Sequence, residues 1–136
     1  MTRVVLDTSA YSNFQRGAEA AVSLISTASW IGMTAIVLGE LRAGFGLGKR
    51  RARNENDLRA FLSHPMVHEL VVDDEAAQIY AEIVGALRTA GTPVPTNDVW
   101  IAAVAAREGV HVVTYDSHFG LISRVGTHVL RSTGGR

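Results

Sequence analysis

The segment from Asp98 to Glu108, with the sequence DVWIAAVAARE, constrains the fold more than any other part of the chain. Its apolar residues recur on almost every side of a helix rather than along one stripe, and Gly109 follows as a typical helix end. A helix of this kind is stable only when other elements cover most of its surface. The pattern therefore predicts a largely buried helix over 98–108 inside a layered domain.

Strand-like and helix-like segments alternate along the rest of the chain. The predicted strands are short, apolar and rich in β-branched residues, and they span 3–7, 30–33, 67–72, 111–115 and 127–130. The predicted helices span about 18–28, 36–45, 56–62, 74–91, 98–108 and 118–122. This alternation predicts an α/β fold with a central, mostly parallel sheet of about five strands and helices on both faces. We expect one domain over residues 1–130 and a flexible tail over 131–136.

Composition excludes several classes of protein. The 136 residues are 47% hydrophobic and 19% charged, which is typical of a compact soluble domain. No apolar run approaches the ~20 residues that span a bilayer, and the N-terminus does not resemble a signal peptide, so we expect no membrane association. Cysteine is absent, which excludes disulfides, thiolate zinc sites and cysteine nucleophiles and is consistent with a cytoplasmic protein. The balance of 13 basic and 13 acidic residues still allows a local charged patch.

Two of the predicted strands end at an aspartate that could belong to a binding site. Asp7 ends the apolar run Val4–Leu6, and Asp116 follows the strand over 111–115. Ligands of such folds bind at the carboxyl ends of the strands, so these two carboxylates converge if their strands are neighbours. Asp73 also ends a strand, and there a helix-capping role is sufficient. Capping is therefore an alternative explanation for Asp7 as well.

Two further acids lie where a carboxylate needs an explanation. A helical wheel places Glu40 between Ile36 and Val37, within the apolar arc of its helix. A carboxylate there must be paired, protonated or bound to a metal, and a salt bridge to an arginine is one alternative. Asp98 lies in the first turn of the buried helix, where the helix dipole favours an acid. We expect it to point toward the strand ends.

Asp7, Glu40, Asp98 and Asp116 are thus four candidate acids from four separate segments. Without a cation they would repel one another, and some of their pKa values would rise. Carboxylates without cysteine favour Mg²⁺ or Mn²⁺ over zinc, and such a site cleaves phosphodiesters by activating water and offsetting negative charge. Another phosphate-handling α/β protein is an alternative, although a haloacid-type phosphatase would have a second Asp where Ser9 stands.

Four segments together resemble the PIN-domain ribonucleases, and in particular the VapC toxins of bacterial VapBC toxin–antitoxin pairs. These segments are VVLDTSAY, the helix that carries Glu40, TNDVWIAAVAAREG and VVTYDSHF. The resemblance covers about residues 3–130. It matches the four acids of the family to Asp7, Glu40, Asp98 and Asp116, and its supporting polar positions to Ser9, Asn97 and Thr114.

The resemblance implies cleavage of structured RNA, such as tRNA or rRNA, that depends on Mg²⁺ or Mn²⁺ and leaves 5′-phosphate and 3′-hydroxyl ends. In that role Asp7, Asp98 and Asp116 hold the metal directly or through water, while Glu40 binds a second ion or orients the attacking water. The resemblance also implies a homodimer, larger assemblies with a cognate VapB-type antitoxin, and DNA contact only through that antitoxin. A non-catalytic binding module with the same fold is the alternative, which four intact acids disfavour.

The basic run Lys49, Arg50, Arg51 and Arg53 is either a solvated surface or, within the ribonuclease hypothesis, a contact to RNA phosphates. The adjacent glycine-rich segment GFGLGKR does not qualify as a P-loop, because it follows a helix and lacks the required Ser or Thr. For His118, two residues after Asp116, we expect a structural or surface role, and a position at the rim of the acidic site is the alternative.

Overall fold

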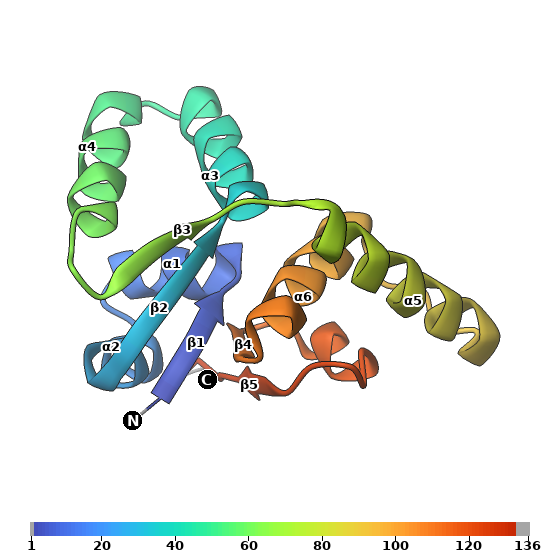
Figure 1. The fold of residues 1–136 in the computed structure, drawn as a ribbon. Helices are drawn as coiled ribbons and strands as arrows, with labels where there is room; N and C mark the ends of the chain where they lie inside the picture. The colour runs from blue at the N-terminus through green and yellow to red at the C-terminus, as the bar shows by residue number, and fades with distance from the viewer. Residues whose placement is uncertain (1, 133–136) are drawn as a thin grey trace.

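The computed structural model describes residues 2–132 and contains a single sheet of five strands (Figure 1). The strand order is β3-β2-β1-β4-β5, and every neighbouring pair is parallel. The bounds are Thr2–Leu6 for β1, Ala28–Thr34 for β2, Val67–Leu70 for β3, His111–Thr114 for β4 and Thr127–Val129 for β5. The predicted sheet is confirmed, and it is wholly rather than mostly parallel. The predicted tail over 131–136 lies mostly outside the described residues, and the predicted domain limits stay predictions.

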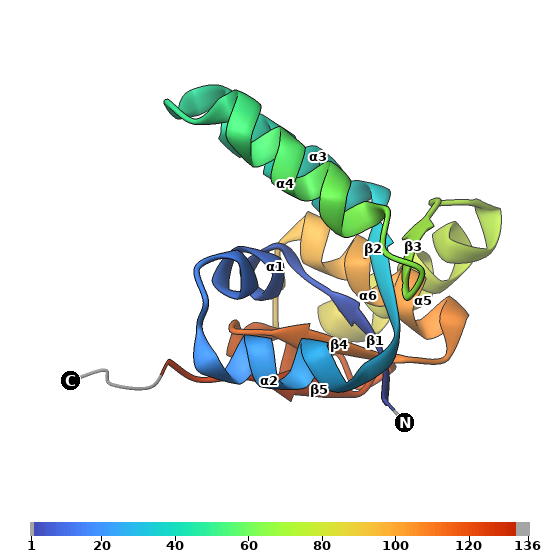
Figure 2. The same cartoon turned by 90° about the vertical axis from the view of Figure 1, so that its left-hand side faces the viewer.

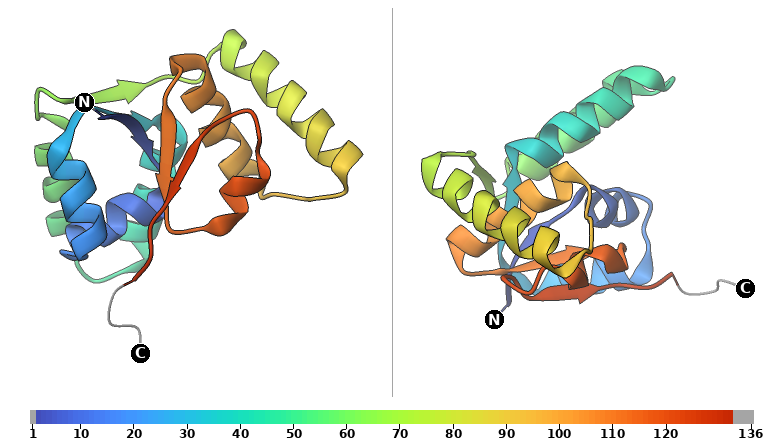
Figure 3. Two further views of the ribbon diagram at one scale, coloured as in Figure 1. Left: turned by 90° about the horizontal axis from the view of Figure 1, so that it is seen from below. Right: turned by 90° about the vertical axis from the view of Figure 1, so that its right-hand side faces the viewer.

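Helices cover both faces of the sheet. Their bounds are Thr8–Gln15 for α1, Glu19–Thr27 for α2, Ala35–Leu47 for α3, Arg51–Leu62 for α4, Asp74–Ala90 for α5 and Thr96–Glu108 for α6, and a short 3-10 helix η1 spans Ser117–Leu121. Figures 2 and 3 show α1 and α2 on one side of the sheet and α5 and α6 on the other, while α3 and α4 project from the domain as a helical hairpin. None of the helices within residues 2–132 has the length and apolarity needed to cross a membrane.

Helix α1 is absent from the predicted elements. Its sequence, TSAYSNFQ, consists mainly of residues with weak helix propensity, so no clear period marks it. Asp7 caps this helix by accepting a hydrogen bond from Ala10 N over 2.8 Å, and Ala10 and Tyr11 pack into the core. The cap and the tertiary packing therefore outweigh a weak local preference.

Two other helix starts differ from the prediction. Helix α4 begins at Arg51 rather than near residue 56, because the basic run is helical and arginine is a good helix former. Helix α6 begins at Thr96 rather than at residue 98. Pro95 occupies the N-cap position, and no side chain accepts a hydrogen bond there. Thr96 and Asn97 lie inside the first turn, which leaves the Asn97 amide available for the site described below.

The hydrophobic core surrounds the central strand β1 and the helix α6. The residues Val4–Leu6 of β1 have no exposed surface. Residues 101–105 of α6 are all buried, which confirms the buried helix predicted over 98–108. Trp100 is half-buried and stacks on Tyr80 of α5, with the two ring centroids 3.9 Å apart. Apolar packing thus covers both faces of the sheet, and the polar groups that follow the strands lie together at the carboxyl ends of the strands.

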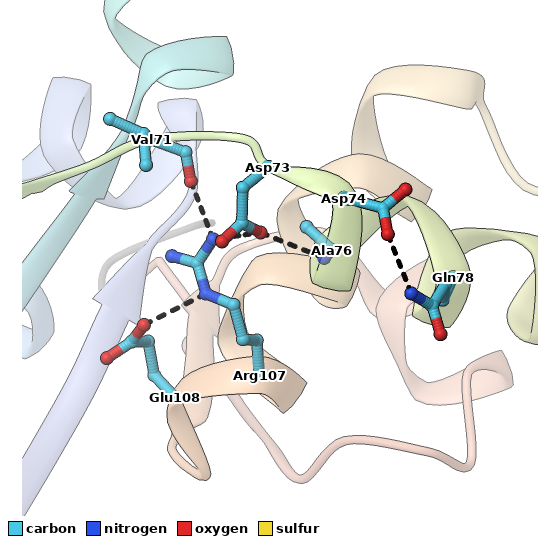
Figure 4. A network of polar contacts seen from close by, with 7 residues as sticks. All are labelled: Val71, Asp73, Asp74, Ala76, Gln78, Arg107 and Glu108. Atoms are coloured by element: carbon cyan, nitrogen blue, oxygen red, sulfur yellow. Dashed lines mark hydrogen bonds and ion pairs between the residues drawn. The ribbon is translucent and has the colours of Figure 1, made fainter.

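Arg107, in the last turn of α6, connects this helix to the start of α5 (Figure 4). Its side chain is only 9% exposed, and Nη1 donates to the Val71 carbonyl and to Asp73 Oδ1, each over 2.8 Å. Nε donates to Glu108 Oε2 over 3.0 Å. Asp73 also caps α5 by accepting from Ala76 N, as the sequence predicts. The guanidinium therefore fixes the β3–α5 connection against the buried helix.

We expect Arg107→Met to lower the free energy of unfolding by about 1–2 kcal/mol, because it removes the hydrogen bonds of a mostly buried guanidinium to the Val71 carbonyl, Asp73 and Glu108. Arg124→Met is the matched control, since Arg124 pairs with Glu82 on the surface and such pairs contribute about 0–1 kcal/mol. Urea unfolding followed by circular dichroism measures both variants. Equal losses in the two variants would contradict the role given to Arg107.

Candidate active site

Asp7 and Asp116 leave the sheet at the same edge because β1 and β4 are parallel neighbours. Leu6 faces Val113 in the register of these strands. The pairing continues one residue further, where Asp7 N donates to the Val113 carbonyl over 3.1 Å. β1 and β4 are therefore neighbours, which is the condition under which the ends of the two strands converge.

Asp7 is only 4% exposed, yet hydrogen-bond donors surround its carboxylate. Oδ1 accepts from Ser9 Oγ over 2.7 Å and from Ala10 N over 2.8 Å, and Oδ2 accepts from Thr114 Oγ1 over 2.5 Å. Burial raises the pKa of Asp7, while the hydrogen bonds from Thr114, Ala10 and Ser9 oppose this increase. The capping explanation and the site explanation are compatible, because Oδ1 caps α1 while Oδ2 faces the end of β4.

The hydroxyl of Thr114 links the two strand ends. It is completely buried, donates to Asp7, and accepts a hydrogen bond from Asp116 N over 2.8 Å. Ser9 forms a second link, because its Oγ donates to Asp7 and accepts from Tyr115 N over 2.9 Å. Each of these hydroxyls therefore orients the Asp7 carboxylate and ties α1 to the backbone that follows β4.

Glu40, on α3, joins α1 to α6. Its half-buried carboxylate accepts from Thr8 Oγ1 at Oε1 over 2.5 Å and from Asn97 Nδ2 at Oε2 over 3.0 Å. No ion pair involves Glu40 in the part of the chain that the structure describes, so the alternative of a salt bridge to an arginine is wrong there. Neutral donors satisfy this carboxylate and leave its negative charge in place.

Asp98 shows that the four acids lie near one another. The pKa of Asp98 is raised to about 6, first by burial and then by the negative charges of Asp116, Asp7 and Glu40, while the charge of His118 lowers it. These three acids come from the end of β4, the end of β1 and the middle of α3. The tertiary fold thus places all four candidate acids within range of mutual repulsion.

His118 and Thr8 also contact the candidate acids of this site. His118 Nδ1 lies 2.7 Å from Asp116 Oδ1, and His118 N donates to the same oxygen over 2.9 Å. These contacts, the backbone hydrogen bond first, lower the pKa of Asp116. The surface role expected for His118 is thus incomplete. In both cases, proximity in sequence to an acid, Asp7 or Asp116, is the signal that could have found the residue.

The carboxylate oxygens of the four acids are suitable ligands for a hard cation, but the side chains do not form a complete metal site as they stand. All four acids offer carboxylate oxygens, which Mg²⁺ and Mn²⁺ prefer, and their mutual repulsion favours a bound cation. Within residues 2–132, however, no three acidic or histidine side chains are arranged so that they could hold a metal ion. Asp7 and Glu40 direct their oxygens at hydroxyl and amide donors. Metal binding would therefore require these side chains to shift or to act through water.

The residues predicted to bind RNA lie on the α3–α4 hairpin and are all exposed. Lys49 and Arg50 belong to the connection between the two helices, and Arg51 and Arg53 to the first turn of α4. Arg50 and Arg53 line a polar hollow next to α1, whereas Lys49 and Arg51 do not. Contact between this run and RNA stays a prediction.

Known proteins resemble this chain over most of its length. The model of the PIN domain matches residues 4–125. Ribonuclease VapC5 of Mycobacterium tuberculosis is 33% identical over 118 residues, which cover 87% of this chain and 86% of that protein. Ribonuclease VapC4 of the same organism is 30% identical over 94 residues, which cover 69% of this chain and 72% of that protein.

Solved structures share the fold. A chain in the crystal structure of VapBC-5 from Mycobacterium tuberculosis has a TM-score of 0.73 at 30% identity, with 96% of this chain and 99% of that chain covered. DNA-bound VapBC from Salmonella typhimurium has a TM-score of 0.83 at 26% identity, with 94% and 98% covered. VapBC2 from Rickettsia felis, bound to a promoter DNA fragment, reaches 0.85 at 21% identity, with 96% and 100% covered, and supports the fold alone.

We expect Asp98→Asn to stabilise the metal-free protein above pH 6. The pKa of Asp98 is about 6 in the folded protein against an ordinary value of 3.8, so protonation favours folding at low pH and this contribution is lost as the pH rises through 6. Asparagine avoids that loss, and the variant should be more stable than wild type by about 1–2 kcal/mol at pH 7.5, after allowance for solvent screening. Urea unfolding in EDTA across this pH range measures the difference. A difference that does not shrink toward pH 4 would contradict the expectation.

Proposed function

The chain belongs to the PIN-domain family, and we propose that it is a divalent-metal-dependent endoribonuclease that acts as the toxin of a type II VapBC toxin–antitoxin pair. The observation that carries the proposal is the raised pKa of Asp98, which results from burial and from three other acids around it. Such an arrangement is electrostatically unfavourable without a cation, as expected of a site shaped to bind one. The relatives described as ribonucleases support RNA as the substrate.

The four acids would divide the work at the metal centre. Asp7, Asp98 and Asp116 would hold Mg²⁺ or Mn²⁺ directly or through water, and Glu40 would hold a second ion or orient the attacking water. A bound ion of this kind lowers the pKa of water and offsets the negative charge that builds on a phosphodiester. Attack on phosphorus with departure of the 3′ oxygen would leave a 5′-phosphate and a 3′-hydroxyl.

Neutral donors would keep the acids oriented before the substrate binds. Thr114 orients Asp7, while Thr8 and Asn97 orient Glu40. Because these donors carry no charge, they fix the direction of each carboxylate without cancelling the negative charge that attracts a cation. Partners of this kind tune metal affinity in other proteins by about 10- to 100-fold. The same role is expected here.

The substrate would be structured RNA, such as tRNA or rRNA. The exposed run Lys49, Arg50, Arg51 and Arg53 would contact its phosphates, which gives salt-dependent binding without reading sequence. Choice of the target would depend on the shape of the RNA rather than on base-edge contacts alone.

A cognate VapB-type antitoxin is the proposed partner, in the cytoplasm. We also infer a homodimer, larger assemblies with the antitoxin, and DNA contact only through the antitoxin. Support comes from the similar structures, which are described as VapBC complexes, two of them bound to DNA. Growth arrest on expression of the chain should be relieved when the antitoxin is co-expressed, and equal arrest with and without it would contradict the pairing.

A non-catalytic binding module is the second candidate function. One observation favours it, namely that the acidic side chains do not form a finished metal cage as they stand. Against it, a module that used the fold only for assembly would gain nothing from the repulsion that raises the pKa of Asp98. An activity assay separates the two candidates.

We expect the wild-type protein to cleave RNA with Mg²⁺ or Mn²⁺ and not with EDTA. Asp7→Asn and Asp98→Asn should each reduce the rate by more than about 100-fold, because each removes a carboxylate from the proposed metal site. Asp74→Asn is the matched control, because Asp74 lies on α5 outside the proposed metal site, where it accepts a hydrogen bond from Gln78 (Figure 4). Gel analysis of tRNA and rRNA after incubation measures the rates. Metal-independent cleavage, or equal rates in all four proteins, would overturn the proposal.

A further inference from the structure

A polar hollow of about 280 Å³ lies between α1, α3 and α4. Three arginines line it together with Tyr11, namely Arg16 at the C-cap of α1, Arg50 from the α3–α4 connection and Arg53 from α4. We refer to it as the arginine hollow. It unites the end of α1 with the basic run, two segments that the sequence patterns do not connect.

The arginine hollow adjoins the acidic site through two helices. On α1, Thr8 donates to Glu40, and Ser12, which lines the hollow, lies one turn or about 6 Å further along the axis. On α3, Leu41 lines the hollow and directly follows Glu40. A ligand in the hollow would therefore lie next to the acids and outside them.

The charge of the hollow is unbalanced. None of its three arginines forms an ion pair with any residue that the structure describes, and Asp57 is the only acid that lines it, so its formal charge is +2. The other arginines near this helix behave differently, because Arg42 and Arg59 both pair with Glu55. The excess positive charge in the hollow favours an anionic ligand.

Tyr11 adds a hydrogen-bond donor without an acceptor. Its side chain is 2% exposed, and its Oη has no hydrogen-bond partner of good geometry within the described residues, although Gln15, which also lines the hollow, lies near enough to oppose the rise in its pKa. Burial, followed by the charge of Asp57, raises the pKa of Tyr11 to about 12, so the hydroxyl keeps its proton. An unsatisfied buried donor costs about 1–3 kcal/mol, and native structures seldom keep one without a reason. An anionic oxygen in the hollow would supply the missing acceptor.

We propose that the arginine hollow binds a backbone phosphate of the RNA strand, next to the phosphodiester that the acidic site would cut. The three arginines would offset its charge, and Tyr11 Oη would donate to one of its oxygens. This inference rests on the proposed ribonuclease function and divides the basic run, because Arg50 and Arg53 face the hollow and Lys49 and Arg51 do not. The contact would position the strand without reading its sequence.

The test is binding of a fluorescently labelled RNA hairpin in EDTA, with Asp98→Asn in every protein so that cleavage does not interfere. Adding Arg53→Gln should weaken binding about five- to eightfold at 0.1 M salt and reduce the slope of log affinity against log salt by about 0.7–0.9, the value of one lost phosphate contact. Arg59→Gln makes the same charge change on the same helix, outside the hollow and outside the basic run, and should keep the original slope. Equal effects of Arg59→Gln and Arg53→Gln would overturn the proposal.

Tyr11→Phe provides a second, uncharged test. It should weaken RNA binding about tenfold, as expected for the loss of one hydrogen bond to a charged oxygen, and leave the salt slope unchanged. It should also preserve or raise the free energy of unfolding, because it removes a buried hydroxyl without a partner. Unchanged RNA affinity in a folded Tyr11→Phe protein would contradict the assignment of Oη.

Inorganic phosphate separates RNA binding from binding of a small anion. It should compete with RNA for the protein that retains Arg53 and have less effect after Arg53→Gln. Phosphate binding without RNA binding would overturn the proposed ligand. If the protein cleaves RNA but Arg53→Gln and Tyr11→Phe bind RNA normally, only the role assigned to the hollow is overturned. If the hollow binds RNA but the protein shows no metal-dependent cleavage, only the ribonuclease function is overturned.

Discussion

Parallel pairing of β1 with β4 is the constraint on which the site depends. It brings together the ends of two strands that are distant in sequence, so that Thr114 can donate to Asp7 from 107 positions away. A strand inserted between them would move these ends apart by another ~4.8 Å and break this contact. Asp116 follows two residues after Thr114, and helix α1 starts from Asp7 itself. Two of the four candidate acids, and the helix α1 that lines the arginine hollow, therefore originate at this one pairing.

The packing that gathers the acids also creates an electrostatic cost. Asp7 is buried and Asp98 is partly buried, and each experiences the charge of other acids. Hydroxyl and amide groups satisfy the hydrogen-bonding capacity of Asp7 and Glu40 but supply no positive charge. The imidazole of His118 lies 2.7 Å from Asp116 Oδ1. The fold thus retains a negative site that a divalent ion would complete, with a separate positive hollow beside it.

Local patterns were enough to predict the layers and the acids, because burial of 98–108 and termination of a strand at Asp7 are both visible in short segments. Helix α1 was missed because its stability comes from a cap and from packing rather than from propensity. The contact of Thr8 with Glu40 depends on how α1 meets α3, which no single segment encodes, whereas the contact of His118 with Asp116 is local to the turn after β4. The position of Arg53 at the arginine hollow follows from the helical phase of α4, which the predicted helix start near residue 56 concealed.

Diffraction from crystals of the protein soaked in Mn²⁺ would test the central claim most directly. The account predicts an anomalous difference peak within direct or water-mediated reach of Asp7, Asp98 and Asp116, and loss of this peak in Asp98→Asn crystals. A peak elsewhere, or no peak at the carboxyl ends of β1 and β4 at millimolar Mn²⁺, would contradict it. Such a result would leave the four acids as a structural feature of the fold rather than as a metal centre.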